Sequence, residues 1–389
     1  MRSGILLLFF CSVIGAIYAQ QFGANPPSVK WQQLNMKEAR IIFPRGLDST
    51  AKKVAETILD AGEYGDTSVV PAGLRKINIV LQNQTTRANG YVGLAPWRSE
   101  FYMTPAFNSF ELGSLPWAKN LTKHEYRHVQ QYQHFRKGLS KLAYYILGEE
   151  GQAVANNASV PNWFFEGDAV YQETYGSEQG RGRLPYFFNG YRALWNEKKD
   201  YRFMKLRNGS WKHYIPDHYI LGYMLSSYGR EKYGKDFWYP VTEEAAQFKG
   251  VFYPFQRAVK KYTGVGYSEF VNNALDFFKA DSVSVGKSRF ITSGNNRYVI
   301  NYSFPQFLND DSLIVLKKTF RNNPAWYLVT EKGEEIVREK DISRDEDFST
   351  GGGKIVYTAY EPDPLWGGRD YSVIKLLNIK TKQVVQLTR

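Results

Sequence analysis

At the centre of the sequence stands the stretch His124-Glu125-Tyr126-Arg127-His128, which has the pattern H-E-x-x-H. On an α-helix, residues four positions apart lie one above the other on the same face. Two imidazoles at this spacing can bind one Zn²⁺, and the glutamate between them can act as a general base. The stretch therefore predicts half of a zinc site, with His124 and His128 as metal ligands and Glu125 as a catalytic residue.

The same residues allow a second interpretation. Thr122 and Glu125 form the pattern T-x-x-E, which is the sequence of a capping box at a helix N-terminus. In that case Glu125 only satisfies a backbone N–H, and the histidines are ordinary helix residues. We expect the surrounding helix to be capped by Ser114, to hold Pro116 in its first turn and to run to about Lys137.

A second stretch, Trp163-Phe-Phe-Glu166-Gly167-Asp-Ala-Val-Tyr171-Gln-Glu173, resembles the third-ligand helix of the gluzincin metallopeptidases. In these thermolysin-like and aminopeptidase-like proteins of the MA clan that helix reads W-x-x-E-G-x-x-x-Y-x-E. The resemblance implies that Glu166 is the third zinc ligand and that Glu173 orients a zinc-bound histidine from behind. The alternative is that both are solvent-facing acids, which the aromatic flank before Glu166 and the glycine after it do not favour.

A third, shorter match concerns stabilisation of an oxyanion. In aminopeptidase-type gluzincins a tyrosine in the pattern Y-x-x-G does this, and Tyr219-Ile-Leu-Gly222 fits the pattern. The resemblance thus implies Tyr219 as a second catalytic residue. His218 and Tyr223 are neighbours that could take the role instead, and aromatic helix packing is a further interpretation.

Two departures from the family shape the functional prediction. The gap between His128 and Glu166 is long, which an inserted helical hairpin around residues 139–148 would explain. The chain also lacks a G-A-M-E-N-like strand motif, with which the exopeptidases hold a free amino terminus; the corresponding segment reads Gly90-Tyr-Val-Gly-Leu-Ala-Pro. This favours an endopeptidase, whose extended substrate could pair with an edge strand in the extended segment Tyr91–Met103.

The rest of the first 286 residues fits a zincin-like α+β domain. Strands are predicted at Ala39–Phe43 and Lys76–Gln82, and a helix begins at Asp48 or Ser49. Further helices are predicted over 139–148, 162–175 and, with breaks, 217–280. We therefore predict a metallopeptidase domain at 20–286, with a catalytic part at 20–175 (a small mixed sheet plus active-site helices) and a mainly helical part at 176–286.

After residue 287 short β-rich segments alternate with turns. Aligning Leu313 with Lys354 gives a repeat of about 41 residues, which lies in the range of propeller blades. The segment 287–389 resembles two blades of a TolB-type β-propeller, which could bind another protein. Because propellers typically need four to eight blades, we expect the chain to be a fragment or a truncated relative of a longer protein. A small β-sandwich is the alternative.

Met1–Ala19 has the features of a secretory signal peptide, with an early arginine and an apolar core. It predicts a secreted or periplasmic chain with no integral membrane segment after cleavage. Cys11, the only cysteine, lies within this segment. A mature chain would hold no thiol, so any zinc site must use histidines and carboxylates.

Composition narrows the functional class. Hydrophobic residues make up 43% of the chain and charged residues 23%, which excludes a disordered chain. The net charge of +12 comes from scattered basic pairs, such as Arg181/Arg183. It can reflect attraction to anionic polymers or membrane surfaces, but the scatter favours a dispersed solvated surface. His134 and His213 are predicted to be surface histidines, and Arg127 is a candidate to pair with a carboxylate.

Together these observations predict a secreted zinc metallopeptidase that binds one Zn²⁺ and cleaves peptide or protein substrates as an endopeptidase, without nucleic-acid binding. The alternative is a non-catalytic scaffold whose propeller segment engages a partner.

Overall fold

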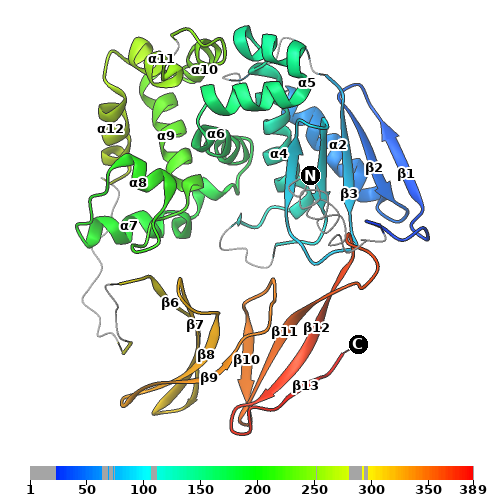
Figure 1. Cartoon of the computed structure of the whole chain (residues 1–389), viewed down its shortest axis with the longest axis vertical. Helices are drawn as coiled ribbons and strands as arrows, with labels where there is room; N and C mark the ends of the chain where they lie inside the picture. Colours follow the sequence, from blue (N-terminus) through cyan, green and yellow to red (C-terminus); the bar gives the residue numbers. More distant parts are fainter. Residues whose placement is uncertain are drawn as a thin grey trace, which may run out of the picture.

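The computed structural model describes residues 23–63, 69, 73, 75–106, 112–250, 252–279, 291–292 and 297–388. Within these ranges the chain is α+β, as predicted: ten α-helices and a mixed sheet form one part, and two antiparallel sheets form another (Figure 1). No helix in the described ranges is both long and apolar enough to cross a bilayer. The predicted signal peptide, Cys11 and the predicted boundary at 286–287 lie outside the described residues.

The mixed sheet has five strands in the order β1-β2-β3-β5-β4. Its inner strands β2, β3 and β5 are parallel, whereas β1 and β4 pair antiparallel at the two edges. The strands are β1 (Trp31–Asn35), β2 (Ala39–Pro44), β3 (Ile77–Gln82), β4 (Gly90–Gly93) and β5 (Arg98–Tyr102). The predicted strands are therefore confirmed, and the predicted extended segment at 91–103 forms β4 and β5, so that β4 is an edge strand.

Helices α2 (Asp48–Glu63) and α4 (Trp117–His134) share an apolar core with this sheet. The alternating residues Ile77, Ile79 and Leu81 of β3 are fully buried, as are Val54 and Ile58 of α2. The spacing of four between Val54 and Ile58 puts both side chains on one helix face. The core thereby fixes α4, which carries the H-E-x-x-H stretch, against the sheet.

The start of α4 differs from the prediction. Pro116, not Ser114, occupies the N-cap position, and the Ser114 hydroxyl donates instead to Gln179 Oε1 at 2.8 Å. Thr122 lies inside the helix, where its hydroxyl donates to the Ala118 carbonyl at 2.6 Å. A capping box at Thr122 and Glu125 is therefore wrong, because its threonine would have to precede the helix.

Helix α5 (Gly138–Ser159) is longer than predicted and bends at Gly148, where the expected helix ended. Gly148 has φ 67° and ψ −151°, a conformation that glycine adopts readily and that interrupts the helix. The predicted hairpin between the two halves of the site is thus two helical arms joined at one glycine.

The remaining helices form a second core rich in aromatic side chains. Trp163 and Phe164 of α6 pack with Trp238 and Phe255, and Trp163 Nε1 donates to the Tyr267 hydroxyl at 3.1 Å. The helices are α6 (Asn162–Tyr175), α7 (Asn189–Asn196), α8 (Phe203–Asn208), α9 (His218–Tyr233), α10 (Trp238–Ala246), α11 (Pro254–Thr263) and α12 (Tyr267–Lys279), with the 3₁₀ turns η1 (Arg181–Arg183) and η2 (Pro185–Phe188).

Helices α6 and α9 cross at a pair of glycines. A Cβ on Gly167 would lie 2.0 Å from the Gly222 carbonyl carbon, and one on Gly222 would lie 2.1 Å from the Trp163 carbonyl oxygen. Neither position has room for a side chain, so both glycines are needed for this approach. The crossing fixes the position of Glu166 on α6 relative to Tyr219 on α9.

The β-rich segment forms two four-stranded antiparallel sheets, in the orders β6-β7-β8-β9 and β10-β11-β12-β13. Buried residues of both sheets share one core, with Trp326 of β8 4.5 Å from Tyr357 of β11 between ring centroids. The strands are β6 (Ile300–Asn309), β7 (Ser312–Thr319), β8 (Ala325–Thr330), β9 (Gly333–Glu339), β10 (Phe348–Gly351), β11 (Lys354–Pro362), β12 (Asp370–Asn378) and β13 (Val384–Gln386). The repeated unit is thus a four-stranded sheet. The propeller itself stays a prediction, and the sandwich alternative stays open.

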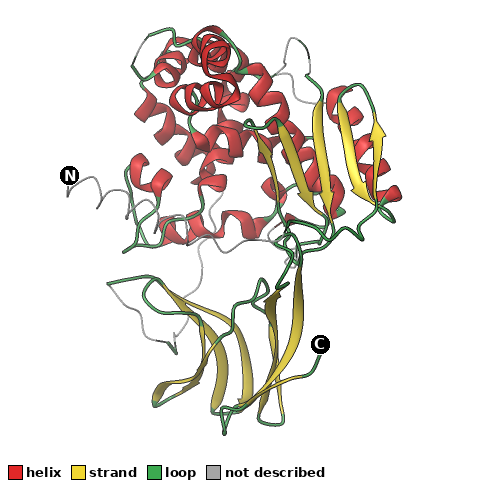
Figure 2. Ribbon diagram, turned by 45° about the vertical axis from the view of Figure 1, so that its right-hand side comes forward, coloured by secondary structure: helices red, strands yellow, loops and turns green. Residues whose placement is uncertain are grey.

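Backbone hydrogen bonds fix the β-rich segment beside the mixed-sheet part (Figure 2). Gly367 N donates to the Gly23 carbonyl at 2.9 Å, and Asp370 N donates to the Gln84 carbonyl at 3.0 Å. On the other side, Phe320 contacts Trp211 with 6.2 Å between ring centroids. The two parts therefore meet at separate places, and a cleft lies between them.

Candidate metal centre

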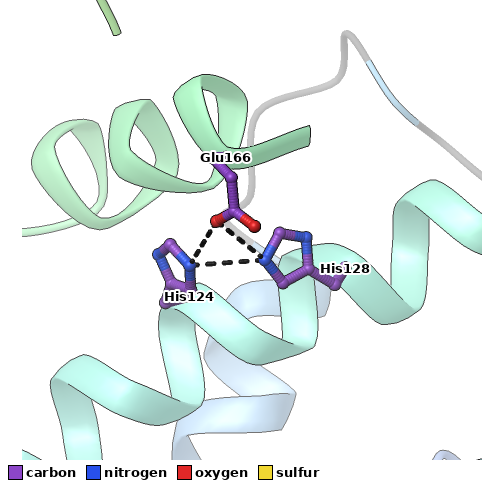
Figure 3. Close-up of side chains that lie close together, drawn as sticks. All are labelled: His124, His128 and Glu166. Carbon is purple, nitrogen blue, oxygen red and sulfur yellow. Dashed lines mark hydrogen bonds and ion pairs between the residues drawn. The ribbon is translucent and has the colours of Figure 1, made fainter. Parts of the chain in front are cut away.

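Helices α4 and α6 bring three potential metal ligands together (Figure 3). His124 Nε2 lies 3.3 Å from Glu166 Oε2 and 3.3 Å from His128 Nε2, and His128 Nε2 lies 3.6 Å from the same carboxylate oxygen. Ligand atoms about 2.0–2.1 Å from a tetrahedral Zn²⁺ lie about 3.3 Å from one another. The three predicted ligands thus form a triangle of nearly the right size to hold such an ion.

The charges of the surrounding cavity also fit a divalent cation. Its lining residues include three carboxylates, Glu125, Glu166 and Glu173, and one guanidinium, Arg181. With neutral histidines the net charge is −2. Glu125 and Glu173 each have one buried oxygen, Oε2, without a hydrogen-bond partner among the described residues, and Glu166 Oε2 faces the two histidines. Unpartnered buried carboxylates are costly, and a dication would remove that cost.

His128 is held by an amide that is itself fixed on both sides. Its Nδ1 lies 2.8 Å from Gln131 Oε1, while Gln131 Nε2 donates to the Phe165 carbonyl at 3.0 Å and to Asp168 Oδ2 at 2.7 Å. The two acceptors orient the amide so that its oxygen faces the histidine. The proton of neutral His128 then lies on Nδ1, and Nε2 keeps its lone pair for a metal.

Asp168, which fixes this amide, lies between two arginines. Arg127 donates to it through Nε at 2.7 Å and Nη2 at 3.2 Å, and Arg230 donates through Nη2 at 2.5 Å. All three side chains are buried. Burial raises the pKa of Asp168, but the two guanidiniums outweigh it and hold the pKa below its usual value. Asp168 is therefore the carboxylate partner of Arg127.

His124 is held by charged groups instead. Glu173 Oε1 lies 3.5 Å from its Nδ1, and Arg181 Nη2 lies 3.1 Å from the same nitrogen. Arg181 also donates to Glu173 Oε1 through Nε at 2.7 Å. Because arginine only donates, neutral Nδ1 either accepts from Arg181 or donates its own proton to Glu173. Metal binding at Nε2 requires the second arrangement.

The neighbouring carboxylates also raise the pKa of both histidines. Burial lowers the pKa of His124, but its interactions with Glu166 and Glu173 outweigh burial and raise the pKa to about 9. The pKa of His128 is raised as well, because Glu166 outweighs burial there. The pKa of Glu166 is lowered in return, since the histidines outweigh the effect of its own burial. Positive charge is thus favoured at this point even without a metal.

The predicted base lies beside the ligands. Glu125 lines the cavity, and burial raises its pKa, which suits a carboxylate that takes up and releases a proton. A Cβ on Gly90 would lie 2.9 Å from Glu125 Cγ and 2.8 Å from Leu121 Cδ1. The first residue of edge strand β4 must therefore be small for the strand to lie against α4 at this point.

Of the three candidates near the start of α9, Tyr219 is the one that lines the cavity. Its ring lies 6.2 Å from the His124 ring between centroids, and the Arg181 guanidinium lies 5.4 Å above it. Burial, with the negative charge of Glu166, raises the pKa of its phenol, so Tyr219 keeps its proton and can donate it in a hydrogen bond. His218 instead contacts Asp217 Oδ1 at 3.1 Å, and Tyr223 packs against Phe187.

The cavity of about 320 Å³ around these residues adjoins a larger cleft of about 1340 Å³. Ala88, Asn89 and Leu112 line both spaces. The larger cleft lies between the mixed-sheet part and the β-rich segment, with Tyr302 and Arg344 on the β-rich side. A long chain can therefore extend from the metal centre into the cleft.

The other histidines are not part of this centre. His134 was predicted to lie on the surface, but it is fully buried, and its Nε2 lies 3.1 Å from Thr242 Oγ1. The prediction failed because the last residue of α4 packs against Thr242 and Tyr239 of α10. His213 is partly buried and lies 3.1 Å from Lys205 Nζ through Nδ1.

Four residues of the site were missed by the sequence analysis, or noted without a role: Gln131, Asp168, Arg181 and Arg230. Asp168 lies within the stretch that identified Glu166, and Gln131 lies three residues after His128. The spacing of three puts Gln131 on the helix face of His128, which was an available signal, whereas Asp168 lies on another face of α6 than Glu166. Arg181 and Arg230 had no such signal, because they come from other elements.

Comparisons with known proteins do not assign the chain to a family. No family model matches it, and no curated protein matches it. Among solved structures it is similar to an aminopeptidase N family protein from Idiomarina loihiensis, with 11% identity and a TM-score of 0.36. The alignment covers 79% of this chain and 66% of that one, slightly less than two thirds of its length.

Proposed function

We propose that the chain is a zinc-dependent metallopeptidase in which His124, His128 and Glu166 hold one Zn²⁺. The single observation that carries this proposal is the triangle of ligand atoms, with sides of 3.3, 3.3 and 3.6 Å, in a cavity whose net charge is −2 when the histidines are neutral. When bound, the ion would polarise a carbonyl oxygen and lower the pKa of a water molecule.

The chain's own residues supply the proton transfers. Glu125 accepts a proton from the attacking water at its free carboxylate oxygen and passes it to the leaving amine. Tyr219 donates a hydrogen bond from its hydroxyl to the oxyanion that forms on the carbonyl. Glu173 accepts a hydrogen bond from His124 Nδ1, and Gln131 accepts one from His128 Nδ1; both keep the ring orientation constant through the reaction.

We further propose that the enzyme is an endopeptidase. The three carboxylates of the cavity belong to the ligand set, the base and the support of His124, so among the described lining residues no other acid is left for a substrate's amino terminus. Edge strand β4 lies beside Glu125 and could pair with an extended substrate, whose remaining length would occupy the larger cleft.

The wider context is proposed from the sequence alone. The metallopeptidase domain would span 20–286 and two propeller blades 287–389, with the blades available to a protein partner. The chain would be exported after removal of residues 1–19 and would act on peptides or proteins rather than on nucleic acids.

The test combines metal analysis with hydrolysis of a broad peptide library, read by mass spectrometry. We expect about one zinc per chain in the wild type and in Glu125→Gln, with internal cleavage only by the wild type. The exposed Glu197→Gln serves as the matched control and should be as active as the wild type. Absence of zinc from both proteins would refute the proposal. Zinc without hydrolysis would favour the non-catalytic scaffold, and stepwise loss of terminal residues would refute the endopeptidase.

A further inference from the structure

In the sequence, the helical hairpin α5 lies between His128 and Glu166. Most of its residues do not line the cavity of the metal centre. A Cβ on Gly151 would lie 2.3 Å from the Ala143 carbonyl oxygen and 2.7 Å from Leu147 Cβ. In a straight helix residues 143 and 151 would be about 12 Å apart. The second arm therefore folds back on the first, and residues 145–148 form the apex.

This hairpin is held firmly to the rest of the molecule. Directly after the apex, Glu149 accepts hydrogen bonds from Arg75 Nη1 at 2.7 Å and from Trp97 N at 2.8 Å. At the base of the first arm, the Ser140 hydroxyl donates to the Ala246 carbonyl of α10 at 3.2 Å. The apex is thus a fixed feature of the surface.

The α5 apex exposes large apolar side chains, and so does the loop that begins beside the base of α5, where a Cβ on Gly138 would lie 2.6 Å from Gln247 Cα. The exposed fractions lie between 52% and 72% for the following residues: Leu142, Tyr145, Ile146, Leu147, Phe252 and Tyr253. The last two belong to the loop between α10 and α11, and α5, α10 and α11 lie at the end of the molecule opposite the β-rich sheets (Figure 1). Soluble proteins seldom expose so many large apolar groups together unless the surface binds something.

Two basic side chains lie over tyrosines of the first α5 arm. The guanidinium of Arg136 lies 5.1 Å from the Tyr144 ring, and Lys141 Nζ lies 6.0 Å from the Tyr145 ring. Over residues 136–154 and 238–262 there are seven basic and four acidic residues, a net charge of +3. Three of the acids are paired, Glu149 with Arg75, Glu243 with Lys137 and Glu244 with Lys261, and the last two partners belong to the seven basic residues counted.

We propose that this end of the molecule, the α5 apex together with the α10–α11 loop, docks onto an anionic phospholipid surface. Apolar and tyrosine side chains would enter the interface, and the lysines and arginines would contact the headgroups, as in other interfacial helices. A second copy of the chain is a poorer occupant, because two surfaces of charge +3 would repel each other across a twofold interface. Docking in this way leaves the cleft beside the β-rich segment open to substrates.

The proposal is independent of peptidase activity and can be tested with the full chain and lipid vesicles. We expect binding to vesicles of equal parts phosphatidylglycerol and phosphatidylcholine, weak binding to phosphatidylcholine alone, and weakening by salt. The double variant Ile146→Ser/Leu147→Ser should bind at least about tenfold more weakly, since two exposed apolar side chains are lost. The double variant Val385→Ser/Leu387→Ser, at exposed apolar positions in the β-rich segment, should bind like the wild type.

Two charge variants and two tryptophan variants complete the test. Lys141→Glu and Lys249→Glu should each weaken binding to the anionic vesicles about fivefold. Ile146→Trp should show a blue shift of its tryptophan emission on adding those vesicles, whereas Leu387→Trp should not. Failure of the wild type to bind, or equal binding by the Ile146/Leu147 variant, would overturn the proposal. Light scattering that shows a dimer lost in that variant, without vesicle binding, would assign the surface to a second copy instead.

Discussion

His128 and His124 lie one turn apart on α4, yet the groups behind them differ in kind. Behind His128 stands the neutral amide of Gln131, which is oriented by a fully buried cluster of Asp168, Arg127 and Arg230. Behind His124 stand the charged side chains of Glu173 and Arg181, which reach the cavity itself. Nδ1 of His128 thus has one oriented acceptor, Gln131. Two groups, Glu173 and Arg181, compete for Nδ1 of His124. Substitutions behind His128 and substitutions behind His124 should therefore affect stability and zinc affinity differently.

The largest effect is expected from breaking the buried cluster behind His128. Asp168→Asn removes a charge that Arg127 and Arg230 share, and the loss of one partner from this buried ion-paired cluster should lower the free energy of unfolding by about 3–5 kcal/mol. Urea denaturation of the metal-free chain measures this, with the exposed Asp310→Asn as control. A loss below about 1 kcal/mol would show that the cluster does not stabilise the fold.

The same variant should change the response to acid. The pKa of Asp168 is lowered in the folded chain by Arg127 and Arg230 despite the opposing effect of burial. A group with a lowered folded pKa contributes stability above its unfolded pKa, about 3.9 for aspartate, and that contribution is lost as the pH falls through the folded value. The wild type should therefore lose stability below about pH 4, and Asp168→Asn should lack this part of the loss.

A smaller effect is expected from changing the amide alone. Gln131→Met keeps the volume but removes the acceptor for His128 Nδ1, so the ring loses its preferred tautomer and orientation. Loss of such a supporting contact typically lowers metal affinity about 10–100-fold. Competition with a zinc chelator measures the affinity, and exposed Gln383→Met is a suitable control. Affinity equal to that of the wild type would mean that packing, not the amide, holds His128.

The residues around the two histidines also differ in how far the sequence could predict them. His124, His128, Glu166 and Glu173 lie on two helices whose internal spacing is fixed, so a pattern could place them. Arg230 is 62 residues from Asp168, and its position depends on the crossing of α6 and α9 at Gly167 and Gly222. That crossing is a property of two packed surfaces, which local periodicity does not contain. The exposure of the α5 apex has the same origin, because a sequence pattern does not state what a helix packs against.

The smallest effect is expected on the charged side, and it should have the opposite sign. In the metal-free site Arg181 can donate to His124 Nδ1, which places the ring proton on Nε2 and opposes metal binding. Arg181→Gln removes this competitor and a positive charge near the proposed cation, while Glu173 remains to accept the Nδ1 proton. Zinc affinity should therefore rise, by less than about tenfold, as judged from the usual size of such supporting contacts. Arg181→Lys keeps the charge and should give little gain. If Arg181→Gln instead loses affinity as strongly as Gln131→Met, Arg181 positions His124 much as the amide positions His128, and the contrast between the two sides disappears.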